Sequence, residues 1–243
     1  MSYLDNIKTL DNFDKGNFFV LYGRPSSGKT HLAGTFPSPL FISYKDQGLA
    51  TVSDVKGDYL EFNGTFQEHQ ALLDEIAKDT THQTIIFDTF GVYCDKLQQD
   101  ILAFYKKKQM TQQMWGDLGT QIKILLDQMK EISNHRYVIV TFHESVESLE
   151  GYEQELTPSV GCFTSPSVKK ALYGIANYAI HTFIYNYLDP QTQKSTPVFS
   201  AHVGTNPYYW TKFQHASNVE IPEIIFNPNY EEIHKLMKAN KTN

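Results

Sequence analysis

The chain has 243 residues, of which 41% are hydrophobic and 20% are charged, and its net charge is −6. This length suits one larger α/β domain, and no apolar run is long enough to span a membrane, so we expect no membrane partner. The negative charge excludes a protein that binds nucleic acid over its whole surface, because such contacts need basic residues. We expect a single domain over residues 1–243, with the polar N-terminal fifteen residues and the last few residues loose.

The N-terminal sequence and the spacing of the cysteines indicate the cellular compartment. The first residues, 1–5, lack a basic region followed by an apolar core, so we expect no secretory signal and a cytoplasmic protein. The two cysteines, Cys94 and Cys162, have neither metal-site nor redox spacing, which fits a reducing compartment.

The first predicted element is a buried strand over the apolar residues 17–22, followed directly by a glycine loop. Residues 23–30 read Gly-Arg-Pro-Ser-Ser-Gly-Lys-Thr and match the phosphate-binding loop pattern G-x-x-x-x-G-K-[ST]. Residues 31–36 predict a short helix that ends before Pro37 and Pro39. Strand, loop and helix in this order predict an ATP site made by Gly23, Arg24, Pro25, Ser26, Ser27, Gly28, Lys29, Thr30 and His31.

Each residue type in this loop answers a need of a bound triphosphate. The glycines allow the backbone to wrap closely, and its N–H groups then cradle the phosphate oxygens. Lys29 places a positive charge against the β- and γ-phosphates, which makes it a catalytic candidate. The hydroxyl of Thr30 is a predicted Mg²⁺ ligand.

The next predicted strand, residues 40–44, ends just before Asp46. A carboxylate at this position can orient or deprotonate the attacking water, so Asp46 is our candidate general base. The alternative is a turn aspartate that precedes Gly48, which is a common use of this residue type. Both interpretations stay open.

Another apolar strand, residues 84–88, ends in a second carboxylate, Asp88. Ligands bind beyond the carboxyl ends of strands in open α/β sheets, so Asp88 can hold the magnesium ion and its water shell. The alternative role is to cap the segment that begins at Thr89. The phosphate loop earlier in the chain favours the metal role.

A third core strand is predicted over residues 137–142. In many P-loop ATPases a strand lies between the phosphate-loop strand and the aspartate strand, and a polar residue at its end senses the γ-phosphate. Thr141 and His143 are our candidates for this role. The alternative is a polar strand end that faces water.

The remaining elements complete a mostly parallel α/β sheet with helices on both faces. Helical periodicity covers residues 66–78, 91–107 and 116–132, and further helices are predicted at 168–176 and 229–238. Further strands are predicted at residues 59–62, 178–185 and 198–202. Residues 150–167 show no periodicity and predict a long, functional loop. Strands that alternate with helices favour the parallel arrangement.

Taken together, these segments resemble the RecA-like P-loop NTPases, and within them a small phage-encoded group associated with single-strand annealing and recombination. A Trp-Gly-Asp-Leu-Gly segment that opens a helix, residues 115–119, is also similar to that group. The resemblance spans about residues 17 to 185 and rests on the ordered segments 22–30, 39–42 with 46–49, 84–89 and 138–144.

The resemblance implies a RecA-like core, assembly into rings or filaments, and single-stranded DNA as a partner, with other recombination or replication proteins as further partners. It places the protein in the cytoplasm of a host cell. Lys169 and Lys170 stand where relatives carry a basic residue that acts on the neighbouring subunit's nucleotide. The alternative is that they form the solvated first turn of the predicted helix 168–176, and both interpretations stay open. The loop over residues 150–167 takes the place of the DNA-binding loop, where Phe163 could stack on an unpaired base.

Three functions are compatible with these features. The first is an ATPase, stimulated by single-stranded DNA, that promotes annealing or strand pairing in phage recombination. The second is an annealing protein that uses ATP as an assembly switch with negligible turnover. The third is a nucleotide kinase, which the two arginines, Arg24 and Arg136, disfavour because kinases usually clamp phosphates with several.

Overall fold

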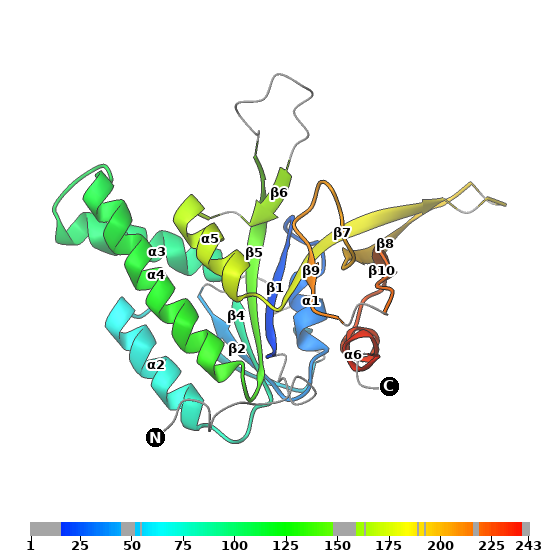
Figure 1. The fold of residues 1–243 in the computed structure, drawn as a ribbon, viewed down its shortest axis with the longest axis horizontal. Coiled ribbons are helices and arrows are strands. Elements are labelled where there is room, and N and C mark those ends of the chain that lie inside the picture. The colour runs from blue at the N-terminus through cyan, green and yellow to red at the C-terminus, as the bar shows by residue number, and fades with distance from the viewer. Residues whose placement is uncertain are drawn as a thin grey trace, which may run out of the picture.

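A computed structural model describes residues 16–44, 52–53, 55–147, 159–162, 164–188, 190–191, 193–215 and 219–239. These residues form one sheet of ten strands together with six helices (Figure 1). No helix within these ranges combines the length and apolarity needed to cross a bilayer. The terminal residues that we expected to be loose lie outside the described residues, as do Asp46 and Phe163.

The first half of the chain contains β1 (Phe18–Gly23), α1 (Lys29–Gly34), β2 (Pro39–Ser43), β3 (Asp58–Glu61), α2 (Phe66–Lys78), β4 (Thr84–Asp88), α3 (Phe90–Phe104) and α4 (Gln112–Ile132). The second half contains β5 (Tyr137–Glu147), β6 (Ser159–Cys162), α5 (Pro166–Ile175), β7 (Tyr178–Leu188), β8 (Ser195–His202), β9 (Lys212–Phe213), β10 (Ile224–Phe226) and α6 (Tyr230–Lys238).

The strand order brings the predicted site residues to one edge of the sheet. The order is β10-β8-β7-β1-β5-β4-β2-β3, with β6 on β5 and β9 on β7. The six strands from β3 to β7 run parallel, whereas β6, β8, β9 and β10 pair antiparallel. Because β5 lies between β1 and β4, the carboxyl ends of these three strands meet at the same edge.

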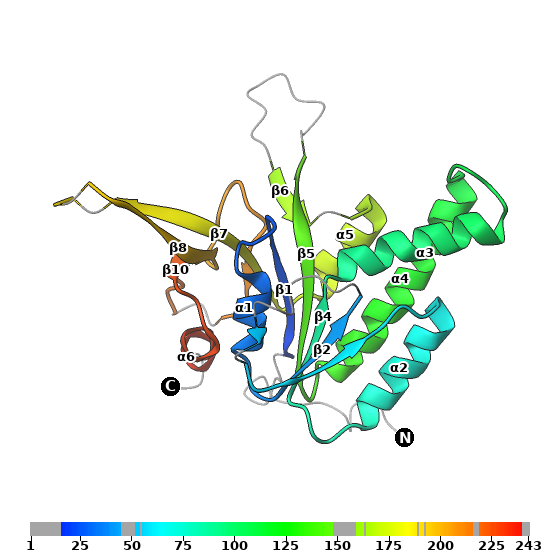
Figure 2. The same ribbon diagram turned by 180° about the vertical axis from the view of Figure 1, so that it is seen from behind.

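Helices cover both faces of the sheet, as predicted (Figures 1 and 2). One buried cluster contains side chains from α2, α3, α4 and α5, and the other contains side chains from α1 and α6. Strand β1 is buried throughout and alternates between the two: Phe18 and Val20 belong to the first cluster, Phe19 and Leu21 to the second. This alternation follows from the two-residue period of a strand, and it fixes β1 at the centre of the fold.

The helix boundaries differ from expectation around the turn between α3 and α4. We predicted a helix up to Lys107, but α3 ends at Phe104, and Lys106 adopts a left-handed conformation with φ of 52°. Helix α4 begins at Gln112, before the predicted start at Gly116, because the Thr111 side chain accepts a hydrogen bond from the backbone N–H of Met114. Short polar caps of this kind lie outside the apolar period on which the prediction depended.

The prediction of an unstructured segment over residues 150–167 was wrong at its C-terminal end. Strand β6 (Ser159–Cys162) pairs antiparallel with β5, and α5 begins at Pro166. The two shortest strands, β9 and β10, were also not predicted. Each of these strands has two to four residues, which is too short for a two-residue period to stand out.

Candidate nucleotide-binding site

The loop between β1 and α1 has a backbone that requires its glycines. A Cβ added at Gly23 would lie 2.2 Å from the backbone oxygen of Thr182, a distance that no side chain can occupy. Gly28 has a left-handed φ of 92°, and a Cβ there would also lie 2.9 Å from the Phe199 ring. The loop therefore packs closely against β7 and β8, and glycine is needed at both positions of close approach.

Lys29 is held across this loop by the loop's own carbonyl groups. Its Nζ atom donates hydrogen bonds to the oxygens of Gly23, at 3.0 Å, and Arg24, at 2.7 Å. The side chain is buried, and this burial lowers its pKa to about 8, although the charges of Asp88 and Glu144 favour the ammonium form. The ammonium group thus sits where loop-bound phosphates would meet it.

Asp88 lies at the end of β4 and is surrounded by hydroxyl groups. The Thr30 hydroxyl donates to its Oδ2 atom at 2.8 Å, and the Thr141 hydroxyl donates to its Oδ1 atom at 2.6 Å. The Thr89 hydroxyl also donates to Oδ1, at 3.1 Å. The structure therefore brings together Thr30 and Asp88, the two residues for which we predicted a metal role.

The donor set at this point fits Mg²⁺. A carboxylate and a hydroxyl are hard oxygen ligands, and protein-bound Mg²⁺ usually has one or two such ligands, several waters and the substrate's phosphate oxygens. Asp88 is almost fully buried, so its carboxylate is fixed in place before a ligand arrives. Thr141 and Thr89 hold its orientation from the side away from Thr30.

Of the two β5 residues that we expected to sense the γ-phosphate, His143 is the better placed; β5 continues past both of them to Glu147. Thr141 is buried and bonded to Asp88, whereas His143 lies opposite Gly23 in the β1–β5 register. Its Nδ1 atom is buried and has no hydrogen-bond partner in the described part of the chain. Burial and the charge of Lys29 lower the pKa of His143, against the opposing effect of Asp88, so the ring is neutral near pH 7.

A cavity of 190 Å³ adjoins the phosphate loop on the side of β7 and β8. The hydroxyl groups of Ser27 and Thr182 lie 2.6 Å apart in its wall. The rings of His31 and Phe199 lie nearly parallel, 10° apart in plane, with their centres separated by 6.2 Å. Leu32, Gly28 and the segment Asn227–Asn229 complete the lining.

Comparison with known proteins agrees with this geometry. A family model described as an AAA domain matches residues 15–201, which is more than half of the chain. The chain belongs to the AAA domain family. No curated protein matches it. The matched range contains the loop, Asp88 and all of β5, so membership supports nucleotide binding and is consistent with a P-loop ATPase.

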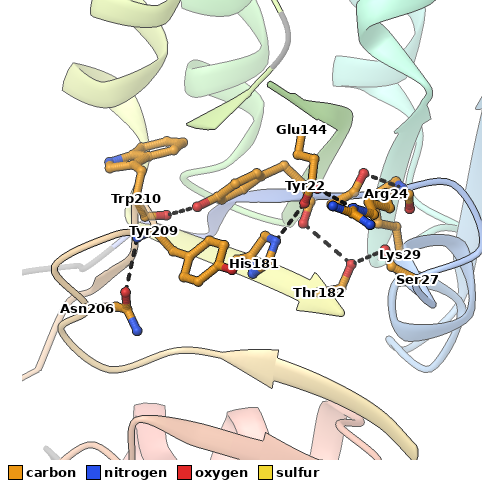
Figure 3. A network of polar contacts seen from close by, with 11 residues as sticks. Tyr22, Arg24, Ser27, Lys29, Glu144, His181, Thr182, Asn206, Tyr209 and Trp210 are labelled. Atoms are coloured by element: carbon orange, nitrogen blue, oxygen red, sulfur yellow. Dashed lines mark hydrogen bonds and ion pairs between the residues drawn. The ribbon is translucent and has the colours of Figure 1, made fainter. Parts of the chain in front are cut away.

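The AAA domain also contains a polar network that the sequence analysis missed (Figure 3). Glu144 lies between a guanidinium group and an imidazole ring: Arg24 donates from Nε to its Oε1 at 2.9 Å, and His181 Nε2 lies 2.8 Å from its Oε2. Burial alone would raise the pKa of Glu144, but the bonds from His181 and Arg24 outweigh it and lower that pKa. Burial lowers the pKa of His181 to about 4 in spite of Glu144.

This network ties the phosphate loop to β7. Arg24, which we predicted to contact the nucleotide, has its Nε atom engaged by Glu144, while the guanidinium remains largely exposed. The three residues come from β7, β5 and the loop, so no local spacing could have predicted their meeting. Its place two residues after the predicted strand 137–142 was the one available signal for Glu144.

Of the remaining predicted site residues, the structure describes Lys169 and Lys170. Lys169 is buried in its own chain, with its Nζ atom 3.3 Å from the Ser145 hydroxyl, whereas Lys170 is exposed. Arg136 donates to the carbonyl of Ile76 at 2.7 Å and so anchors the C-terminal end of α2. Asp46 and Phe163 are not among the described residues, so their roles stay predictions.

Proposed function

We propose that this AAA domain binds Mg²⁺–ATP, hydrolyses it, and acts with single-stranded DNA in annealing and strand pairing during phage recombination. One observation carries the ATP part: Lys29, Thr30 and Asp88 converge at one sheet edge, beneath a loop that only glycine permits. The RecA-like resemblance of the sequence supports the DNA part.

The chain's own residues divide the work at this edge. The loop N–H groups and Lys29 bind the β- and γ-phosphates, and Thr30 with Asp88 holds the metal. When bound, Mg²⁺ neutralises charge that develops on the phosphate oxygens. Thr141 keeps the Asp88 carboxylate in position. We assign the γ-phosphate contact to His143, whose buried Nδ1 has no hydrogen-bond partner among the described residues. Asp46 orients the attacking water in this proposal.

The nucleobase occupies the 190 Å³ cavity beside the loop. This volume is below the roughly 300–1,000 Å³ of pockets for drug-sized ligands, so it suits one planar ring system while the phosphates lie on the loop. Phe199 and His31 offer ring faces, and Asn229 offers an amide to the base edge. This arrangement also gives His31 the nucleotide-contacting role that the sequence predicts.

The proposal includes a ring or filament of identical subunits, in which a basic residue from a neighbour completes the site. Arg24 and Arg136 are both bonded within their own chain, and Lys169 is buried there. Lys170 is exposed on α5, so we assign the neighbour-directed role to it. The positions of both arginines also argue against a nucleotide kinase, which needs arginines free to clamp phosphates.

The test is ATP hydrolysis with and without single-stranded DNA, in the wild type and in Lys29→Ala. We expect turnover that DNA stimulates and that Lys29→Ala abolishes, because the substitution deletes the phosphate-facing charge. Lys78→Ala, at an exposed lysine in the last turn of α2, is the matched control and should behave as the wild type. Turnover that ignores DNA would contradict the DNA part, and turnover retained in Lys29→Ala would contradict the site.

A further inference from the structure

The turn between α3 and α4 combines exposed aromatic rings with exposed positive charge. We call residues 104–115 the α3–α4 tip; in Figure 1 it lies at the far end of both helices, away from the sheet. Phe104 is 80% exposed and Trp115 is 42% exposed. Lys106, Lys107 and Lys108 are exposed between them. Exposed apolar side chains that gather within a rim of polar residues mark interaction sites.

The lysines of the tip have no internal partner in the described part of the chain. No hydrogen bond or ion pair among those residues involves the side chains of Lys106, Lys107 or Lys108. On the same helix, by contrast, Lys96 pairs with Asp100 at 2.6 Å. The nearby carboxylate of Asp117 accepts the Tyr105 hydroxyl at 2.8 Å. The positive charge of the tip is therefore available to an external anion.

One of these lysines stands where stability alone favours glycine. Lys106 has a left-handed φ of 52°, and its N–H bonds the carbonyl of Ala103 at 3.1 Å. The N–H of Lys107 bonds the carbonyl of Leu102 at 3.0 Å, which completes a Schellman helix end. Glycine is the usual residue at the left-handed position of this motif, because it has no Cβ that strains the backbone there. Lys106 therefore places a positive charge at a position where glycine would be more stable.

We propose that the α3–α4 tip binds single-stranded nucleic acid, with Phe104 stacked on an unpaired base and the three lysines against phosphates. This inference rests on the DNA part of the proposed function, but it assigns the contact to residues that the proposed function does not use. Unpaired bases expose their faces to an aromatic ring, whereas bases in a duplex are already stacked. An acidic protein would satisfy the lysines but leave Phe104 in water.

The position of the tip links it to the nucleotide edge. Helix α3 begins at Phe90, two residues after Asp88, and has 15 residues. At 1.5 Å per residue the helix is about 22 Å long, so DNA at the tip lies one helix away from the metal residues. Loss of the tip is therefore expected to reduce DNA stimulation of ATP turnover while turnover without DNA stays unchanged.

The experiment measures binding of fluorescein-labelled oligo(dT) by anisotropy over a range of salt concentrations. Replacing Lys106, Lys107 and Lys108 by glutamine should lower the salt slope by about 2, since each phosphate contact on a single strand contributes roughly 0.7. Phe104→Ala should weaken binding about tenfold at every salt concentration without changing the slope, because stacking carries no counterion release. The two variants thus separate charge from stacking.

A matched control removes the same charge from other helix ends. Lys78, Lys235 and Lys238 are exposed in the last turns of α2 and α6, and their joint replacement by glutamine should leave oligo(dT) binding close to wild type. Lys106→Gly retains the helix end and should raise the melting temperature while lowering the salt slope by about 0.7. If Lys106 has only a structural role, Lys106→Gly will raise the melting temperature without changing the salt slope.

Three results would overturn the inference. If the wild type binds oligo(dT) and the tip variants bind it equally well, the tip is wrong while the DNA part of the proposed function stands. If the wild type binds no oligo(dT), both the tip inference and the DNA part of the proposed function are wrong. If the tip variants lose binding to duplex DNA or polyglutamate as much as to oligo(dT), the tip binds any acidic polymer and has no preference for unpaired bases.

Discussion

The nucleotide edge of the sheet and the α3–α4 tip differ in how their charged groups are buried and bonded. At the nucleotide edge Lys29 is 6% exposed and Asp88 is 2% exposed, and each is already bonded to neighbouring groups. At the tip Phe104 is 80% exposed, and the lysines beside it have no partner in the described part of the chain. Buried, fixed groups favour one ligand geometry, whereas exposed charges attract a polymer and are screened by salt.

Among the variants that test this contrast, Asp88→Asn is expected to have the largest effect. Asparagine retains the size of the side chain but removes the charge that holds the metal, so ATP turnover should fall about a hundredfold. Binding of ATP without Mg²⁺, measured by calorimetry, should stay near wild type. The matched variant Asp127→Asn, at an exposed position on α4, should change neither quantity. Equal loss of metal-free binding would show that Asp88 supports the fold of the loop and not the metal.

A second effect follows from the lowered pKa of Lys29. Burial places this pKa at about 8, so above pH 8 the nucleotide-free protein loses the proton that phosphate binding requires. ATP affinity should be flat below pH 8 and fall by up to about tenfold per pH unit above it, because binding must then take up a proton. Titrations from pH 7 to pH 9 would reveal this trend. Lys29→Arg, which stays charged, should bind more weakly but without the decline.

A smaller effect is expected at the cavity beside the loop. Phe199→Ala removes a ring that lines it, and ATP affinity should fall about two- to tenfold, the usual range for one aromatic contact. Phe226→Ala, which removes another half-exposed ring on β10, is the control and should have no effect on ATP. If tripolyphosphate binding falls as much as ATP binding, Phe199 supports the loop and does not contact the base.

The features that could be predicted from sequence are those with local physical signals. Strand β4 and helix α2 have the predicted bounds, because an apolar run marks the first and a helical period marks the second. A capping box of Thr65 and Glu68 fixes the start of α2. The meeting of Lys29, Thr30 and Asp88 could be expected as well, since parallel strands bring their carboxyl ends to one edge.

The features that sequence reasoning missed depend on which strands become neighbours. Glu144 meets Arg24 across 120 residues and His181 across 37 residues, and neither contact follows from a motif. The cavity at the loop likewise needs β8 beside β7, so that Phe199 reaches Gly28. The order of strands decides such contacts, and hydrophobic periodicity does not encode it.

The most direct test of the central claim is the affinity of Mg²⁺–ATP for the wild type and for Lys29→Ala, measured by titration calorimetry beside Lys78→Ala. We predict a loss of at least about thirtyfold in Lys29→Ala, because a buried charge that meets the phosphates is removed. Lys78→Ala should bind as the wild type does. Wild-type affinity in Lys29→Ala, with an unchanged melting temperature, would contradict the assignment of this loop as the nucleotide site.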